Sequence, residues 1–135
     1  MPLQAVFYRD PAGNEPVLDV LNSLPDRKRA VIENQLDRLN MQEPDGPPLP
    51  QPWTSQIEGE LREFRAHYGE EHYRVLYRRS GNLLVLLHLI RKTTRSVPKR
   101  DILTAKERWA DFKRRMEAAK RTPPRAAGHD APRRR

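Results

Sequence analysis

The segment from Glu63 to Arg100 contains the side chains of this chain that are best suited to chemistry on an anion. Arginines alternate with apolar residues at 63–65 (EFR) and at 73–77 (YRVLY), and residues 91–100 (RKTTRSVPKR) are rich in cations and contain no acid. Arginine stays charged and binds phosphate oxygens through two parallel hydrogen bonds. Placed in advance of the reaction, it also stabilises the negative charge that develops on a phosphorane. These residues therefore predict a site for a phosphodiester.

Other catalytic chemistries find no support in the sequence. The absence of cysteine excludes disulfides, thiol nucleophiles and thiolate metal sites. There is no phosphate-binding glycine loop and no serine in a nucleophile-elbow motif. The four histidines lack metal-ligand spacing with nearby carboxylates. An enzyme here would work with Arg, Lys, His and Tyr. On RNA the 2′-OH already supplies the nucleophile, so we expect neither a metal nor another cofactor.

The overall charge also indicates a polyanionic partner. The net charge is +8 and the isoelectric point is about 10.3. Residues 118–135 hold six cations and one acid, so they carry +5 and leave only +3 for residues 1–117. The position of the cations in the folded part therefore matters more than their number.

The length of 135 residues predicts one domain. We see no signal peptide and no apolar run long enough to span a bilayer, so we expect a cytoplasmic protein with no membrane partner. We place the domain at residues 1–117. Residues 118–135, rich in Pro and Arg and without periodicity, predict a disordered basic tail.

Hydrophobic periodicity and turn residues predict an α+β fold. We expect an antiparallel-rich twisted sheet of about four strands, with two N-terminal helices on one face and a C-terminal helix. The C-terminal helix follows Pro98 and carries an apolar stripe at spacings of three and four residues. Leu83–Lys92 is apolar on both faces, which predicts the central strand. The expected order is a strand at 3–9, two helices between 14 and 39, strands at 56–65, 73–79 and 83–92, and a helix from 98 to 116.

A series of short motifs resembles the RelE/ParE superfamily of bacterial toxins, and within it the HigB-like, phage-derived group of type II toxin–antitoxin systems. The matching residues are Gly59, 63–65 (EFR), 73–77 (YRVLY), 88–92 (HLIRK), 98–102 (PKRDI) and Ala105. The resemblance covers residues 3–117 and implies a RelE-like fold. One extra residue lies between Gly59 and the first arginine motif, so Arg62 competes with Arg65 for that position. We prefer Arg65, because residues 63–65 keep the order acid, apolar, arginine.

The resemblance implies a function and roles for individual residues. Members of the family enter the ribosome and cleave mRNA by 2′-OH attack on the adjacent phosphate, which would make this chain a metal-independent endoribonuclease that inhibits translation. Arg65 and Arg74 would bind the scissile phosphate, Lys92 would hold phosphate or transfer a proton, and His88 would be a general acid or base. The expected contacts with the RNA backbone are Arg62, Arg91, Arg95, Lys99 and Arg100. The implied partners are the ribosome, mRNA and a cognate helix-turn-helix antitoxin, through which the chain would oligomerise.

The same residues also fit other classes of protein. A ParE-like toxin keeps the fold but inhibits a target such as DNA gyrase by binding alone, and a phage-derived remnant would have no activity. The arginines also fit solvated cations or partners of Glu63 and Glu71. His88, in an apolar strand, also fits a histidine satisfied within the core.

Overall fold

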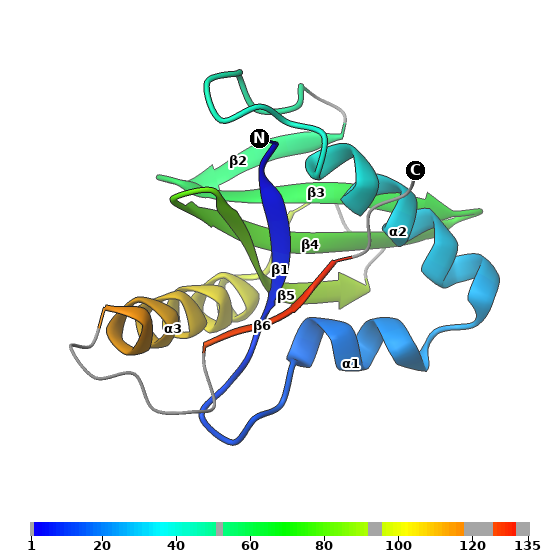
Figure 1. Ribbon diagram of the computed structural model, residues 1–135. Helices are drawn as coiled ribbons and strands as arrows, with labels where there is room; N and C mark the ends of the chain where they lie inside the picture. The colour runs from blue at the N-terminus through cyan, green and yellow to red at the C-terminus, as the bar shows by residue number, and fades with distance from the viewer. Residues whose placement is uncertain (1, 51–52, 92–95, 118–125, 132–135) are drawn as a thin grey trace.

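The molecule is a three-layer arrangement, with one mixed sheet between helices on both of its faces (Figure 1). The computed structural model describes residues 2–50, 53–91, 96–117 and 126–131. Helices α1 (Pro16–Ser23) and α2 (Asp26–Leu39) cover one face, and α3 (Lys99–Met116) covers the other. The expected α+β class and the placement of the helices are confirmed.

The sheet holds six strands in the order β2-β3-β4-β5-β1-β6. Only β1 and β5 pair in parallel, and the other four pairs are antiparallel. Their bounds are β1 Gln4–Tyr8, β2 Thr54–Glu58, β3 Leu61–Tyr68, β4 Glu71–Ser80, β5 Leu83–Arg91 and β6 Ala127–Asp130. The expected count of about four strands is too low. Gly59, with φ +56°, lies in a tight turn that divides residues 56–65 into β2 and β3.

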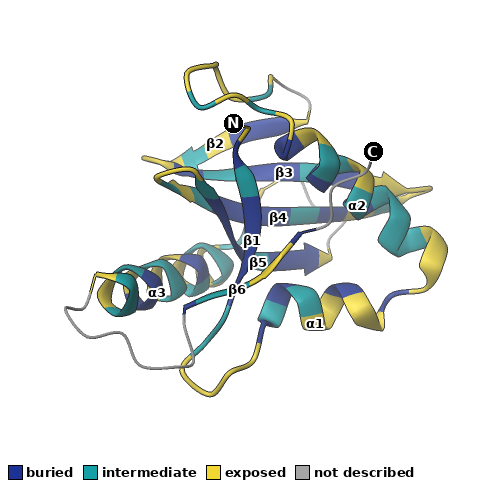
Figure 2. Ribbon diagram, viewed as in Figure 1, coloured by how far each residue is buried: buried dark blue, intermediate teal, exposed yellow. Residues whose placement is uncertain are grey.

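Two hydrophobic clusters fill the spaces above and below the sheet. On one face, Phe7, Phe64 and Val75 pack against Leu21 and Leu36 of the two N-terminal helices. The cluster on the other face joins sheet residues to α3; its members include Val6, Leu76, Val85, Leu87, Ala105 and Phe112. Figure 2 shows the centre of the sheet buried, while the outer sides of the helices and the β3–β4 turn are exposed. Strand alternation therefore assigns each β3 and β4 side chain to a face.

Strand β5 is buried on both faces, as its composition predicts, but it is not regular. The pairing with β4 shifts from Leu76↔His88 to Tyr77↔Leu86, so Leu87 is the extra residue of a β-bulge. Leu87 packs in the cluster under α3, and His88 contacts α3 side chains. The bulge thus turns two successive side chains toward the same helix.

Strand β6 corrects the prediction for the tail. Residues 118–135 are predicted to be disordered, yet Ala127–Asp130 pairs antiparallel with β1, beside Val6 and Tyr8. A carboxylate of Glu15 accepts a hydrogen bond from the His129 backbone N–H at 2.6 Å. A Cβ on Gly128 would overlap Glu15 Oε1 and lie 2.9 Å from the Phe7 carbonyl oxygen, so this close approach requires glycine. Residues 118–125 and 132–135 lie outside the described part of the chain.

Candidate functional site

The centre of the candidate site is a pair of arginines on adjacent strands. Arg65 of β3 and Arg74 of β4 are direct cross-strand partners, so both side chains rise from the same face of the sheet, the face that α3 covers. The Arg65 side chain is 42% exposed and the Arg74 side chain 12% exposed. The sequence-based expectation that these two groups act together is compatible with this register.

A buried carboxylate fixes the pair. Glu63 lies one row away on the same face and is 1% exposed. Its Oε1 accepts a hydrogen bond from Arg65 Nε at 2.8 Å and one from Ser55 Oγ at 3.1 Å, while its Oε2 lies 3.6 Å from a terminal nitrogen of Arg74. One acid thus holds two arginines, and the three groups together keep a net positive charge. A guanidinium has five N–H donors, so an arginine that contacts a carboxylate can also bind an anion.

Arg62 is separated from this pair. It lies opposite Tyr77 on the face covered by α1 and α2, and its guanidinium donates to Thr54 Oγ1 at 2.9 Å. The register therefore places Arg65, and not Arg62, beside Arg74. Arg62 does not belong to the same surface.

His88 is held within the protein by both ring nitrogens. Arg108 of α3 donates to His88 Nδ1 at 3.0 Å, and the ring's Nε2 lies 2.8 Å from Asp101 Oδ1. Because a guanidinium only donates, this network assigns the proton to Nε2. Burial lowers the pKa of His88, which favours the neutral ring, although Asp101 acts in the opposite direction. His88 thus links the β5 bulge to the start of α3 and presents no unoccupied nitrogen to a substrate.

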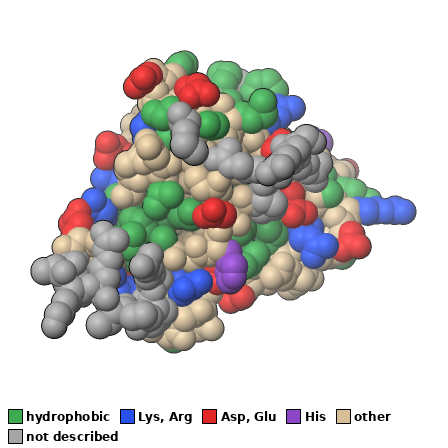
Figure 3. All heavy atoms as spheres, in the orientation of Figure 1, with side chains coloured by type: hydrophobic (Ala, Val, Ile, Leu, Met, Phe, Trp, Pro, Cys, Tyr) green, Lys and Arg blue, Asp and Glu red, His purple; other side chains and the backbone are tan. Residues whose placement is uncertain are grey.

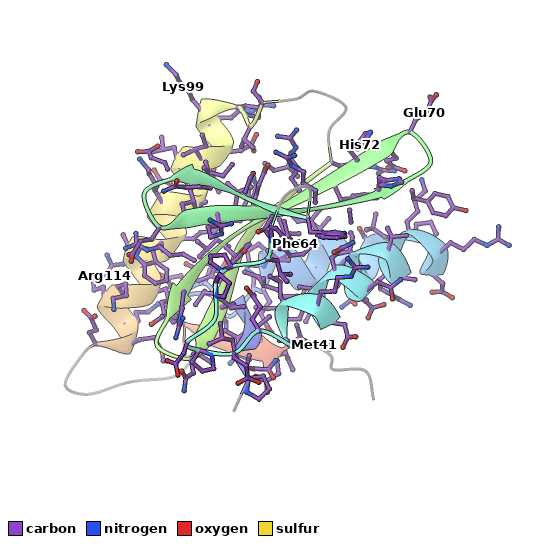
Figure 4. The ribbon with its side chains drawn as sticks, turned by 90° about the horizontal axis from the view of Figure 1, so that it is seen from above. Met41, Phe64, Glu70, His72, Lys99 and Arg114 are labelled. Carbon is purple, nitrogen blue, oxygen red and sulfur yellow. The ribbon has the colours of Figure 1, made fainter. Side chains whose placement is uncertain are left out.

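The predicted RNA-binding cations lie around the end of β5 and the start of α3. Lys92 and Arg95 fall outside the described residues. Arg91 is an exposed side chain that pairs with Glu71, and hydrogen bonds from Lys28 and Arg91 lower the pKa of Glu71 to about 2. Lys99 and Arg100 begin α3 and are exposed; Figure 4 shows Lys99 pointing away from the body of the molecule.

Two histidines that the sequence analysis did not select lie next to the arginine pair. His67 and His72 are cross-strand partners, both exposed, with ring centroids 6.0 Å apart and an interplanar angle of 39°. Strand alternation places them on the same face as Arg65 and Arg74, one row closer to the β3–β4 turn. In the sequence, His67 follows Arg65 by two residues and His72 precedes Arg74 by two residues. This spacing is the sequence signal that points to the two histidines.

Elsewhere on the described surface, cations are mixed with acids. In the view of Figure 3, the described Lys and Arg side chains are interspersed with Asp and Glu. On the α3 side, a hollow of about 490 Å³ separates the β2–β3 turn from α3, and there Arg78 stacks over Trp109 at 4.5 Å and pairs with Glu60. That hollow carries acids as well as cations. The row containing Arg65 and Arg74 is therefore the clearest anion site among the described residues.

The fold and the site define an α+β domain with paired cations on one face of its sheet. The sequence matches the family described as Phage derived protein Gp49-like (DUF891) over residues 19–110, which is more than half of the chain and includes all the site residues named above. The chain belongs to this family, which is associated with toxin–antitoxin systems and RelE-like toxins. No curated protein matches the chain. Among the described residues, none of the helices has the length and apolar character that a membrane span requires.

Proposed function

We propose that this chain is a HigB-like toxin of a type II toxin–antitoxin system, an endoribonuclease that cleaves mRNA on the ribosome without a metal ion. A cognate helix-turn-helix antitoxin would hold it inactive, and the toxin would act in the cytoplasm. The family match supports the toxin class. The observation that carries the proposed chemistry is the pairing of Arg65 and Arg74 across adjacent strands, with both guanidiniums held by the buried Glu63.

In this proposal the arginines act on the scissile phosphate. Their N–H groups bind the non-bridging oxygens and stabilise the additional charge of the pentacoordinate transition state. The carboxylate of Glu63 keeps the two guanidiniums in place before the substrate arrives, so little reorganisation is needed during the reaction. Lys92 remains a proposed phosphate ligand on the basis of the sequence resemblance alone.

The proposed contacts with the RNA backbone are Arg91, Arg95, Lys99 and Arg100. The three of these that the structure describes are exposed. Arg62 is left out of this set, because it lies on the opposite face of the sheet. His88 is left out of the proton-transfer step, because Asp101 and Arg108 occupy its two nitrogens.

Induction of the chain in bacteria, followed by mapping of mRNA 5′ ends, tests the proposal. We expect new ends inside ribosome-covered codons, and a loss of about 100-fold or more in cleavage with Arg74→Ala or Arg65→Ala. Arg65→Lys keeps the positive charge but loses the two parallel hydrogen bonds to phosphate. We therefore expect a cleavage rate between those of the parent chain and Arg65→Ala. Arg114→Ala, at the far end of α3 in Figure 4, is the matched control and should cleave like the parent chain.

One observation favours a second candidate, a non-catalytic toxin that inhibits its target by binding. The Arg74 side chain is only 12% exposed and is ion-paired, as in a purely structural role. Growth arrest with intact mRNA, unchanged by Arg74→Ala, would support this candidate and would overturn the nuclease proposal.

A further inference from the structure

The outer part of the β3–β4 hairpin brings like side chains face to face. Arg65 is opposite Arg74, and in the next row His67 is opposite His72. The alternate rows, on the other face, hold complementary apolar pairs such as Phe64 with Val75. The unusual pairing is thus confined to one face. Figure 4 shows this hairpin extending beyond Phe64 to its turn at Glu70, with His72 beside the turn.

Like charges directly opposite one another destabilise a pair of strands. Glu63 offsets the repulsion between the two arginines, and the imidazoles of His67 and His72 contact each other without a hydrogen bond or ion pair to another described side chain. The other acids near the turn are Glu70, which is exposed, and Glu71, which is bound to Lys28 and Arg91. An anion bound over these rows would further offset the repulsion between the two arginines. A phosphodiester is such an anion, and its cleavage by the 2′-OH also requires groups that transfer protons.

We propose that His67 and His72 are the acid–base pair of the site, an inference that rests on the proposed nuclease function. The arginine and histidine rows are about 7 Å apart along the strands. A phosphate held by Arg65 and Arg74 therefore has its neighbouring ribose within reach of the imidazoles. Both rings are exposed and able to rotate toward the substrate. His88 cannot take this role, because Asp101 and Arg108 occupy its two ring nitrogens.

The proton transfers in this step balance. One imidazole accepts the proton of the 2′-OH as the bond between O2′ and phosphorus forms. The other, as imidazolium, donates a proton to O5′ as the bond between phosphorus and O5′ breaks. The products are a 2′,3′-cyclic phosphate and a 5′-hydroxyl, so the step consumes no water, metal or other reactant. Imidazole is the side chain most often used for such transfers near neutral pH.

Single-turnover cleavage of mRNA on purified ribosomes tests the pair with His67→Gln, His72→Gln and the double variant. General acid–base catalysis contributes about 100-fold or more, so we expect each single variant to lose at least that factor. Each single variant should also change the pH dependence of the single-turnover rate relative to the parent chain, because it removes one of the two proton-transferring groups. His129→Gln is the control, since this exposed histidine lies on β6 and contacts Glu15.

A substrate with sulfur in place of O5′ at the cleavage site separates the two roles. A thiolate leaves without receiving a proton, so the variant that lacks the acid should regain the parent rate on this substrate while the variant that lacks the base should not. Rescue of neither variant, or single variants that cleave normal mRNA as fast as the His129→Gln control, would overturn the pairing while leaving the nuclease function intact. A parent chain that does not cleave at all would overturn both proposals.

Discussion

At the scale of single residues, the buried carboxylate of Glu63 controls the two arginines of the site. The sequence resemblance placed Arg65 and Arg74 on one phosphate, and the cross-strand register of β3 and β4 puts both side chains on one face of the sheet. The sequence did not reveal that Glu63, at 1% exposed, is buried between them and Ser55. A charged residue next to Phe64 in an alternating strand is expected to face solvent, but Glu63 lies between Ser55 of β2 and Leu76 of β4 in the sheet and is buried.

Glu63→Gln should destabilise the fold strongly, because Glu63 is buried and its charge compensates the half-buried Arg74 and the Arg65 it hydrogen-bonds. Breaking a buried ion pair from one side costs about 3 kcal/mol. We expect a fall of that order in the free energy of unfolding, measured by urea denaturation. Glu60→Gln is the matched control: Glu60 pairs with Arg78 but is 79% exposed, so its loss should cost less than about 1 kcal/mol. Equal effects of the two substitutions would contradict the assigned role of Glu63.

Tyr8 makes the alkaline limit of stability testable. Burial, together with its hydrogen bond to Asp111 at 2.5 Å, raises the pKa of Tyr8 from 10.0 to about 12. A raised folded-state pKa gives stability that is complete below pH 10 and is lost as the pH rises toward 12. Between pH 10 and pH 12, the parent chain should therefore lose about 2 kcal/mol of its free energy of unfolding through Tyr8. Tyr8→Phe has no hydroxyl to titrate and should not show this loss. Parallel pH curves for the two chains would show that Tyr8 is not the group responsible.

At the scale of elements, the sequence predicts those helices and strands whose own hydrophobic pattern specifies them. The apolar stripe of Ile102, Ala105, Trp109, Phe112 and Met116 predicts α3, and these residues pack against the sheet as expected. The bulge in β5 has no such signal, because Leu87 and His88 continue an otherwise regular run. The contacts of His88 with Asp101 and Arg108 follow from this bulge and therefore could not be predicted.

Strand β6 was missed for a different reason. The sequence of Ala127–Asp130, AGHD, has little β-propensity and no alternation of its own. It forms a strand because the edge of β1 offers backbone groups for pairing and because Glu15 accepts a hydrogen bond from the His129 backbone N–H. Strand formation here depends on tertiary contacts, which the local sequence pattern of these four residues does not indicate.

Gly128→Val should release β6 from the sheet. The added side chain cannot share space with Glu15 and the Phe7 carbonyl. We therefore expect faster hydrogen exchange at the backbone amides of Arg9, which bonds to Ala126 just before β6, and of Ala131, which bonds to Ala5 of β1. Gly46→Ala, which meets only ordinary contacts beginning at 3.4 Å, is the control. Unchanged protection of Arg9 and Ala131 in Gly128→Val would contradict the pairing of β6 with β1.

At the scale of the whole molecule, charge is divided between a mildly basic domain and a strongly basic tail. Residues 118–135 carry +5 of the net +8, while the anion site occupies one face of the sheet within the domain. Deleting the tail would confuse two effects, since it also removes β6 from the edge of β1. Substitution of the cations that flank β6 separates charge from structure.

Replacement of Arg125, Arg133, Arg134 and Arg135 by Gln should weaken RNA binding without impairing cleavage. Removing one phosphate-binding cation reduces the slope of log affinity against log salt by about 0.7 for a single strand, so we expect a shallower slope by up to about 3. Binding of a single-stranded RNA, measured by fluorescence anisotropy over a salt series, gives this slope. The single-turnover cleavage rate at saturation should stay within about twofold, because the proposed mechanism gives the tail cations no role at the scissile phosphate. An unchanged slope would place the RNA-binding cations of the chain entirely within the domain, and a large fall in the cleavage rate would make the tail part of the catalytic site.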